Sequence, residues 1–303
     1  MAVFLSYAVV FLSFRNYSES KSGGYKAYVK ALCKKLLIPY LLYSFLYFLF
    51  NAAKVILLHK EINLLHNFLG ILIQLRGTDF TVGVWFLPLL FLSEVVVYPL
   101  VLCRKRIQVP AFILLLTIGF IYANQVHQVL PWGLDAVPLS SFFIWMGYQY
   151  KGMSLEWFRQ KTKVVSILFC LGLLCANIVI GMWNDYRIGD SVDMYSMTYG
   201  NPILYVVAAV AGIGFTIILC RDLLDSFEIK PMKCIGQNTL HIYCIHGLVI
   251  TFIREIREKL IGFGPFTTIV EQLLVSLLVM SICIGLIYCG RVLKSKMARV
   301  RNT

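Results

Sequence analysis

The stretch KTKVVSILFCLGLLCANIVIGMW, residues Lys161–Trp183, decides the fold class of this chain. From Val164 to Trp183 it contains no charged side chain. An α-helix needs about 20 predominantly apolar residues to cross the ~30 Å hydrocarbon core of a bilayer, and this run meets that requirement. We therefore expect a membrane-spanning helix that begins directly after a basic loop.

The composition of the whole chain extends this conclusion. Of its 303 residues 59% are hydrophobic and 14% are charged, and the mean hydropathy is +0.77. A soluble domain carries roughly 45–50% apolar and about 25% charged residues, so lipid must surround much of this chain. The net charge of +13 does not indicate a nucleic-acid partner, because the basic residues lie in loops between apolar stretches and no nucleic-acid-binding motif accompanies them.

Seven other stretches are apolar enough to be read as spans, although Val109–Ala123 is short. The eight predicted spans are Leu36–Leu58, Val84–Leu102, Val109–Ala123, Leu134–Tyr150, Val164–Trp183, Pro202–Cys220, Ile235–Ile253 and Thr267–Gly290. Met1–Phe14 is apolar but too short to cross fully, and Leu64–Leu75 is expected to lie in the interface or to re-enter the membrane. We predict an all-α, polytopic helical bundle of about nine spans. The loops are too short for a second soluble domain, so residues 1–303 are expected to form a single membrane-embedded domain.

The distribution of lysine and arginine predicts the orientation. Alternate loops, at residues 15–35, 104–108, 151–163, 221–233 and 291–301, hold 21 of these residues, whereas the loops between them hold six. Cytoplasmic loops of membrane proteins carry an excess of Lys and Arg. The pattern therefore predicts a multi-pass protein of the cell membrane whose basic loops and C-terminus lie in the cytoplasm.

The nine cysteines do not form a metal-binding framework. No C-x-x-C pair occurs, and Cys170, Cys175, Cys283 and Cys289 lie inside apolar runs, where an unpaired cysteine acts as a small hydrophobic residue. We expect neither structural disulfides nor a metal site.

The run IGQNTLHIYCIHGLV, from Ile235 to Val249, places polar residues inside a predicted span. Asn238 and Thr239 can cap the start of a helix. His241 and His246 are five residues apart, about 140° around a helix, so they are not expected to hold a metal together. A single imidazole at His246, near Tyr243, could act as a general base, since imidazole exchanges protons around neutrality. A neutral histidine that only bonds neighbouring helices explains the spacing equally well.

Three other polar or aromatic residues need an explanation. Glu94 lies within an apolar span, where a carboxylate must pair, accept hydrogen bonds or stay protonated, and functional and structural readings are equally supported. Asp135 is more simply explained as a helix-start carboxylate. Trp85 lies near a span end, as membrane-interface tryptophans do. The basic stretch Lys26–Lys35 fits cytoplasmic anchoring, which is compatible with attraction of a phosphorylated cofactor.

Several stretches together resemble one family. Met1–Phe14 resembles the segment MPLFFFLSGYLF, and VKALCKKLLIPYLLYS (Val29–Ser44) resembles a basic run leading into RLLIPYL. VWFLPLLFLSEVVVY (Val84–Tyr98) resembles LWFLPALFLVEI, and the segment Leu130–Tyr148 resembles LPWSLDIALVAFFFFLLGY. Ile235–Val249 resembles LGKNSLEIYLLHPLV. In this order they are similar to acyltransferase family 3 of bacterial membrane proteins, particularly its fucose 4-O-acetylase-like members.

The resemblance implies an O-acyltransferase. Such a protein moves an acyl group, usually acetyl from acetyl-CoA as co-substrate, to a hydroxyl of a cell-envelope carbohydrate. The candidate site residues are His246 and Glu94 for catalysis, Trp85, Asp135, Asn238 and Tyr243 for substrate binding, and Lys26, Lys30, Lys34 and Lys35 for the phosphates of CoA.

The chain also departs from the family pattern. Family members usually begin with a further helix that carries a Gly-His pair, whose histidine is regarded as catalytic, and nothing here matches it. We therefore expect a chain truncated at its N-terminus relative to the family, and its activity as given is left open. Two rival hypotheses are a transporter or flippase, which predicts broken helices in two related halves, and a non-catalytic membrane scaffold.

Overall fold

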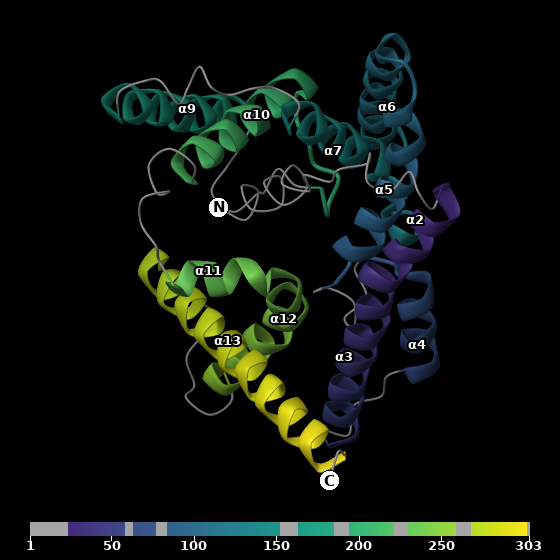
Figure 1. Ribbon diagram of the computed structural model, residues 1–303, viewed down its shortest axis with the longest axis vertical. Helices are drawn as coiled ribbons and strands as arrows, with labels where there is room; N and C mark the ends of the chain where they lie inside the picture. Colours follow the sequence, from purple (N-terminus) through teal and green to yellow (C-terminus); the bar gives the residue numbers. More distant parts are fainter. Residues whose placement is uncertain are drawn as a thin grey trace. The chain divides into compact units, whose positions relative to one another are not determined.

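The computed structural model describes residues 24–57, 63–76, 84–151, 163–184, 194–220, 230–258 and 268–301 (Figure 1). Within these ranges the chain forms helices and connecting turns and no strand, which confirms the predicted all-α class. The apolar segment Met1–Phe14 lies outside the described residues.

Each of the eight predicted spans overlaps a long helix. The long helices are α3 (Ile38–Leu57), α5 (Phe86–Leu102), α6 (Lys105–Gln125), α7 (Val137–Lys151), α9 (Lys163–Trp183), α10 (Pro202–Ile218), α12 (Thr239–Ile256) and α13 (Ile269–Arg301). The segment Leu64–Leu75, predicted to lie in the interface or to re-enter the membrane, contains the 10-residue helix α4 (Leu64–Ile73). The described residues also contain two shorter α-helices, α2 (Gly24–Leu32) and α11 (Lys230–Gln237). The predicted span Ile235–Ile253 begins in α11 and continues into α12.

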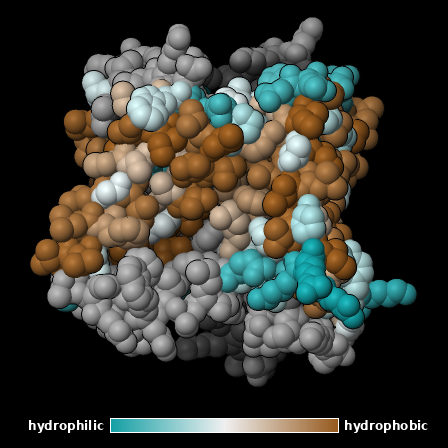
Figure 2. Space-filling model, turned by 90° about the horizontal axis from the view of Figure 1, so that it is seen from above, coloured by the Kyte–Doolittle hydropathy of each residue, from teal (hydrophilic) through white to brown (hydrophobic). Residues whose placement is uncertain are grey.

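Five helical segments are long and apolar enough to cross a membrane. They are Gly24–Ala53, Lys105–Gln125, Lys163–Trp183, Thr239–Ile256 and Val270–Gly290. The apolar helices α5 and α10 have 17 residues each, which at 1.5 Å per residue is shorter than the ~30 Å hydrocarbon core. The structure thus supports five spans among the described residues, and nine spans stay a prediction. Figure 2 shows hydrophobic residues over much of the described surface on the face in view, as lipid contact requires.

The chain divides into two compact units, each built from separate segments. Unit 1 comprises Met1–Ile38, Ile73–Arg76 and Trp85–Phe227, and unit 2 comprises Pro39–Leu72, Gly77–Val84 and Glu228–Thr303. In unit 1, α7 packs against both α5 and α6, and α10 packs against α9 (Figure 1). In unit 2, α12 packs against α13.

The core of unit 1 is closely packed where α5, α6 and α7 meet. Val97, Phe112, Leu139 and Phe143 are fully buried there. At Gly119 of α6 a Cβ atom would lie 3.3 Å from the backbone nitrogen of Leu139, so the absence of a side chain lets α6 and α7 approach. The three helices are therefore held at close range in the middle of the unit.

A buried glutamine joins the same three helices at one end. Gln108 of α6 donates from Nε2 to the carbonyl oxygens of Val101 and Cys103, which end α5, at 2.9 and 2.8 Å. Its Oε1 accepts from Nε2 of Gln149 at 3.0 Å and from Nε1 of Trp145 at 3.4 Å, both on α7. These bonds satisfy a polar side chain that lipid could not solvate.

Unit 2 is held by apolar contacts and a few hydrogen bonds. Ile242 and Val249 of α12 pack with Val279 and Cys283 of α13. The hydroxyl of Tyr40 on α3 donates to the carbonyl oxygen of Ile71 on α4 at 2.5 Å. Apolar contacts with α13 therefore hold α12 in place within unit 2.

Candidate functional site

A buried ion pair lies at one end of unit 1. Arg76, which follows α4, binds the carboxylate of Asp135, which precedes α7, and the two side chains are 1% and 0% exposed. The same guanidinium donates from Nη1 to the carbonyl oxygen of Met194 at 2.8 Å, and Asp135 accepts from the backbone N–H of Leu130 at 3.0 Å. Asp135 is therefore the partner of a buried cation, and the contacts described for it do not include the helix capping that its sequence position suggests.

Two aromatic rings flank this ion pair. The Cζ atom of Arg76 lies 5.7 Å from the centroid of the Trp85 ring and 5.9 Å from that of Tyr195. The two rings meet edge to face at 5.3 Å, and both are half-buried. A guanidinium at these distances is attracted by aromatic faces, so the ion pair and the rings form one unit.

Gln74 adds an unusual feature to this cluster. Its side chain is fully buried, and neither Oε1 nor Nε2 has a hydrogen-bond partner within the described part of the chain. The Nε atom of Arg76 is buried without a partner in the same way. The backbone oxygen of Gln74 accepts from the N–H of Trp132 at 3.2 Å, which places these residues side by side. A buried polar group without a partner costs about 1–3 kcal/mol, so such groups need a functional or structural reason.

The backbone around this cluster is strained. Gln74, Trp132 and Met197 have φ values of +50°, +60° and +56°, a region that non-glycine residues seldom adopt. Strain of this kind persists only where the surrounding structure enforces it, and it gathers at functional sites. We call the set Gln74, Arg76, Trp85, Trp132, Asp135 and Tyr195 the Arg76 cluster.

The segment that carries Tyr195 is fixed by a buried asparagine. Asn184, after α9, donates from Nδ2 to the carbonyl oxygen of Tyr199 at 2.9 Å and accepts from the N–H of Asn201 at 2.6 Å. Gly200 has φ +61°, and a Cβ there would lie 2.6 Å from Oδ1 of Asn184. Only glycine permits this close turn.

Glu94 lies elsewhere in unit 1. Its carboxylate on α5 is buried and accepts from the hydroxyl of Tyr28 on α2 at 2.6 Å. The Tyr28 ring in turn stacks on Tyr98 with centroids 4.1 Å apart. Glu94 is thus held against the helix that carries Lys26 and Lys30, which are exposed.

Lys34 and Lys35 lie in an unexpected helical form. The residues Cys33–Leu37 make a π-helical turn between α2 and α3. Both lysine side chains are exposed. π-Helical turns are often found at functional sites, and no pattern in the sequence predicted this one.

The two histidines of α12 have different partners. Nδ1 of His246 lies 2.6 Å from the carbonyl oxygen of Tyr243. A carbonyl only accepts, so Nδ1 carries the hydrogen and Nε2 of the neutral ring is left as an acceptor. Nδ1 of His241 lies 2.9 Å from the hydroxyl of Tyr43 on α3. The rings of Tyr243 and His246 are 5.6 Å apart, as expected for residues near one helix face.

Asn238 lies at the junction of α11 and α12. It occupies the capping position of α12, but its side chain makes no capping bond, so the expectation that it caps this helix is wrong. Its Nδ2 donates instead to the carbonyl oxygen of Cys234 at 2.7 Å. Thr239 likewise bonds carbonyl oxygens of α11, those of Ile235 and Gly236. Both side chains terminate the preceding helix, because its last carbonyls lack partners of their own.

The predicted site residues therefore fall into three groups. Trp85 and Asp135 meet through Arg76, which sequence reasoning missed together with Gln74 and Tyr195. Glu94 lies against α2, and Asn238, Tyr243 and His246 share one region of unit 2. The signal for Arg76 was available, because an aspartate in an apolar run calls for a cation.

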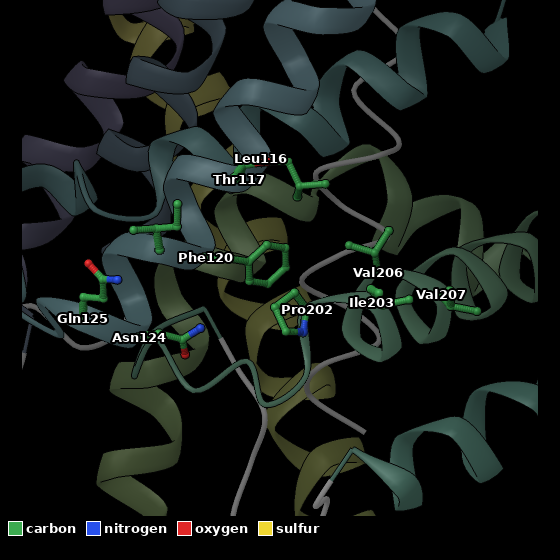
Figure 3. Close-up of a pocket in the computed structure, with 10 residues that line it drawn as sticks. Leu116, Thr117, Phe120, Asn124, Gln125, Pro202, Ile203, Val206 and Val207 are labelled. Carbon is green, nitrogen blue, oxygen red and sulfur yellow. The ribbon is translucent and has the colours of Figure 1, made fainter.

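An apolar pocket of about 510 Å³ lies apart from all of these residues, between α6 and α10 of unit 1 (Figure 3). Leu116, Phe120 and Val206 line its apolar part, and Asn124 and Gln125 line one end. None of the predicted site residues lines it.

Fold and site together define a helical membrane protein with a buried charged cluster and a half-buried imidazole on a candidate span. The chain belongs to acyltransferase family 3: the acyltransferase domain of this family matches residues 3–288. Neither curated proteins nor solved structures gave a match. Family membership establishes an acyltransferase domain and favours a transferase over a transporter or a scaffold.

Proposed function

We propose that this protein is a membrane O-acyltransferase that moves an acetyl group from acetyl-CoA to a hydroxyl of a cell-envelope carbohydrate. Membership of an acyltransferase family supports the class of reaction. The observation that carries the assignment of a base is the bond between Nδ1 of His246 and the Tyr243 carbonyl, which leaves Nε2 able to accept a proton.

The chemistry follows from that tautomer. Nε2 of His246 takes the proton of the acceptor hydroxyl as its oxygen attacks the thioester carbonyl carbon. The tetrahedral intermediate collapses with cleavage of the C–S bond, and the imidazolium returns the proton to the departing thiolate of CoA. General base catalysis of this kind contributes typically 10²–10⁴-fold to the rate.

The second part of the proposal concerns acetyl-CoA, whose phosphates we assign to lysines near the start of the described residues. Lys26, Lys30 and Lys34 are exposed on the helical segment that begins at Gly24. Ammonium groups there would attract the phosphates of CoA from the cytoplasm, the side on which the charge pattern predicts this segment to lie. Glu94 stabilises the same helix through Tyr28.

The test compares two histidines of one helix. Membranes are isolated from cells that express the full chain and are incubated with acetyl-CoA labelled in its acetyl group. The label that reaches envelope carbohydrate is then measured. His246→Ala is expected to lower transfer by roughly 10²–10⁴-fold without lowering the membrane level of the protein. His241→Ala is the matched control and should retain transfer, because its ring is bonded to Tyr43. Unchanged transfer by His246→Ala removes this residue as the base.

A further inference from the structure

The Arg76 cluster combines a closed ion pair, two half-buried aromatic rings and a buried amide without a partner within the described residues. The ion pair of the cluster has no net charge, because the carboxylate of Asp135 balances the guanidinium of Arg76 and both side chains are buried. An anionic ligand would therefore gain little there, and a cationic one would compete with the guanidinium already beside the two rings. The ligand that fits is neutral.

The remaining groups specify what kind of neutral ligand. Trp85 and Tyr195 offer half-buried aromatic surface for an apolar C–H face. The amide of Gln74 offers a donor and an acceptor side by side, both buried and unpartnered within the described residues. A sugar ring supplies both features, since it has an apolar face and neighbouring hydroxyls that each donate and accept.

The position of the cluster agrees with such a ligand. Arg76, Asp135 and Tyr195 come from or adjoin three separate loops, and the charge pattern assigns all three loops to the side away from the cytoplasm. Envelope carbohydrates are found on that side.

We infer that the Arg76 cluster binds the carbohydrate acceptor, with Trp85 and Tyr195 stacking on the sugar ring and Gln74 bonding neighbouring hydroxyls. This inference rests on the proposed acyltransferase function, which it extends by assigning acceptor recognition to residues of unit 1. Arg76 is a positioning residue, because it holds the two rings and is itself bound to Asp135 and Met194.

Binding is measured on the full chain in a detergent without a sugar headgroup, and without acetyl-CoA. The probes are the methyl glycosides of glucose, galactose, mannose, fucose and N-acetylglucosamine, followed by saturation-transfer NMR. At least one glycoside is expected to bind in the wild type. Gln74→Leu should weaken that binding roughly 3- to 10-fold, as loss of a neutral hydrogen bond does, and Tyr195→Ala roughly tenfold.

Tyr288→Ala, which removes a highly exposed tyrosine of α13, is the matched control and should bind like the wild type. Thermal unfolding of each variant shows whether it is folded. Absence of binding for every glycoside, or unchanged binding in both folded Gln74→Leu and Tyr195→Ala, overturns the subsite. The binding assay contains no acyl donor, so it tests the subsite separately from the transfer reaction. Glycoside binding that the variants weaken supports the subsite even if His246→Ala retains transfer. Transfer without glycoside binding supports the acyltransferase function but overturns the subsite.

Discussion

The Arg76 cluster of unit 1 and His246 on α12 of unit 2 differ in how their polar groups are paired. The charges of Arg76 and Asp135 are closed on each other, at 1% and 0% exposure. The ring of His246 is half-buried, with Nδ1 donating to a backbone carbonyl oxygen and Nε2 as the acceptor nitrogen of that tautomer. The charges of the Arg76 cluster are paired with each other, whereas His246 has a ring nitrogen, Nε2, that can accept a proton.

This difference follows from the cost of burying charge. A charge in a low-dielectric interior must be paired, and a pair that is closed in this way cannot exchange protons cheaply. A neutral imidazole can lie at intermediate depth without a partner for each nitrogen. Burial therefore separates the Arg76 cluster, which we infer to recognise a ligand, from His246, which we propose as the base.

The largest effect is expected from Asp135→Leu. This change leaves the buried guanidinium of Arg76 without its counter-charge, which costs about 3–5 kcal/mol. The thermal midpoint of the purified protein in detergent, and its level in the membrane, should both fall sharply.

The double variant Arg76→Met with Asp135→Leu is the control for this prediction. Replacing both members of a buried pair by apolar residues is often neutral, so most of the lost stability should return while the single variant stays unstable. A midpoint unchanged by Asp135→Leu alone would show that the two charges are not paired in the protein.

A smaller effect is expected from Tyr28→Phe. The ring remains to stack on Tyr98, but the carboxylate of Glu94 loses a 2.6 Å hydrogen bond in a buried position. Hydrogen bonds to charged groups contribute about 1.5–3 kcal/mol, and the midpoint should fall accordingly. Tyr25→Phe makes the same change on the same helix, where the hydroxyl is exposed and bonds the Val95 carbonyl at 3.3 Å. Tyr25→Phe should therefore lower the midpoint less than Tyr28→Phe does. An equal loss of stability in the two variants would show that the buried bond to Glu94 is no stronger than the exposed bond to Val95.

The helices were predictable because apolar length is a local property of the sequence. The predicted span Val164–Trp183 and the observed helix Lys163–Trp183 differ by one residue, since basic residues bound the run at its start. The start of α7 was predicted at Leu134 and lies at Val137, because Trp132 turns out of helical geometry just before it. Helix boundaries of this kind depend on a turn that composition does not reveal.

The sites were less predictable because their contacts are distant in sequence. Arg76 and Asp135 are 59 residues apart, so their pairing depends on the tertiary fold and not on local sequence. His246, by contrast, was proposed directly from the sequence, as an ionisable residue inside an apolar run. Its tautomer was not predictable, because it depends on the direction in which the ring turns toward the Tyr243 carbonyl.

The smallest effect is expected from Tyr43→Phe in unit 2. The hydroxyl of Tyr43 meets Nδ1 of His241 at 2.9 Å, but His241 is exposed and can find other partners. Loss of such a neutral bond costs about 0.5–1.5 kcal/mol, so the midpoint should fall slightly and acetyl transfer should stay near the wild-type rate. A loss of transfer as large as that of His246→Ala, in a variant with a normal midpoint, would move the proton chemistry from His246 to the Tyr43–His241 pair. Half-burial alone would then no longer identify the base, and the partner of each ring nitrogen would have to be tested separately.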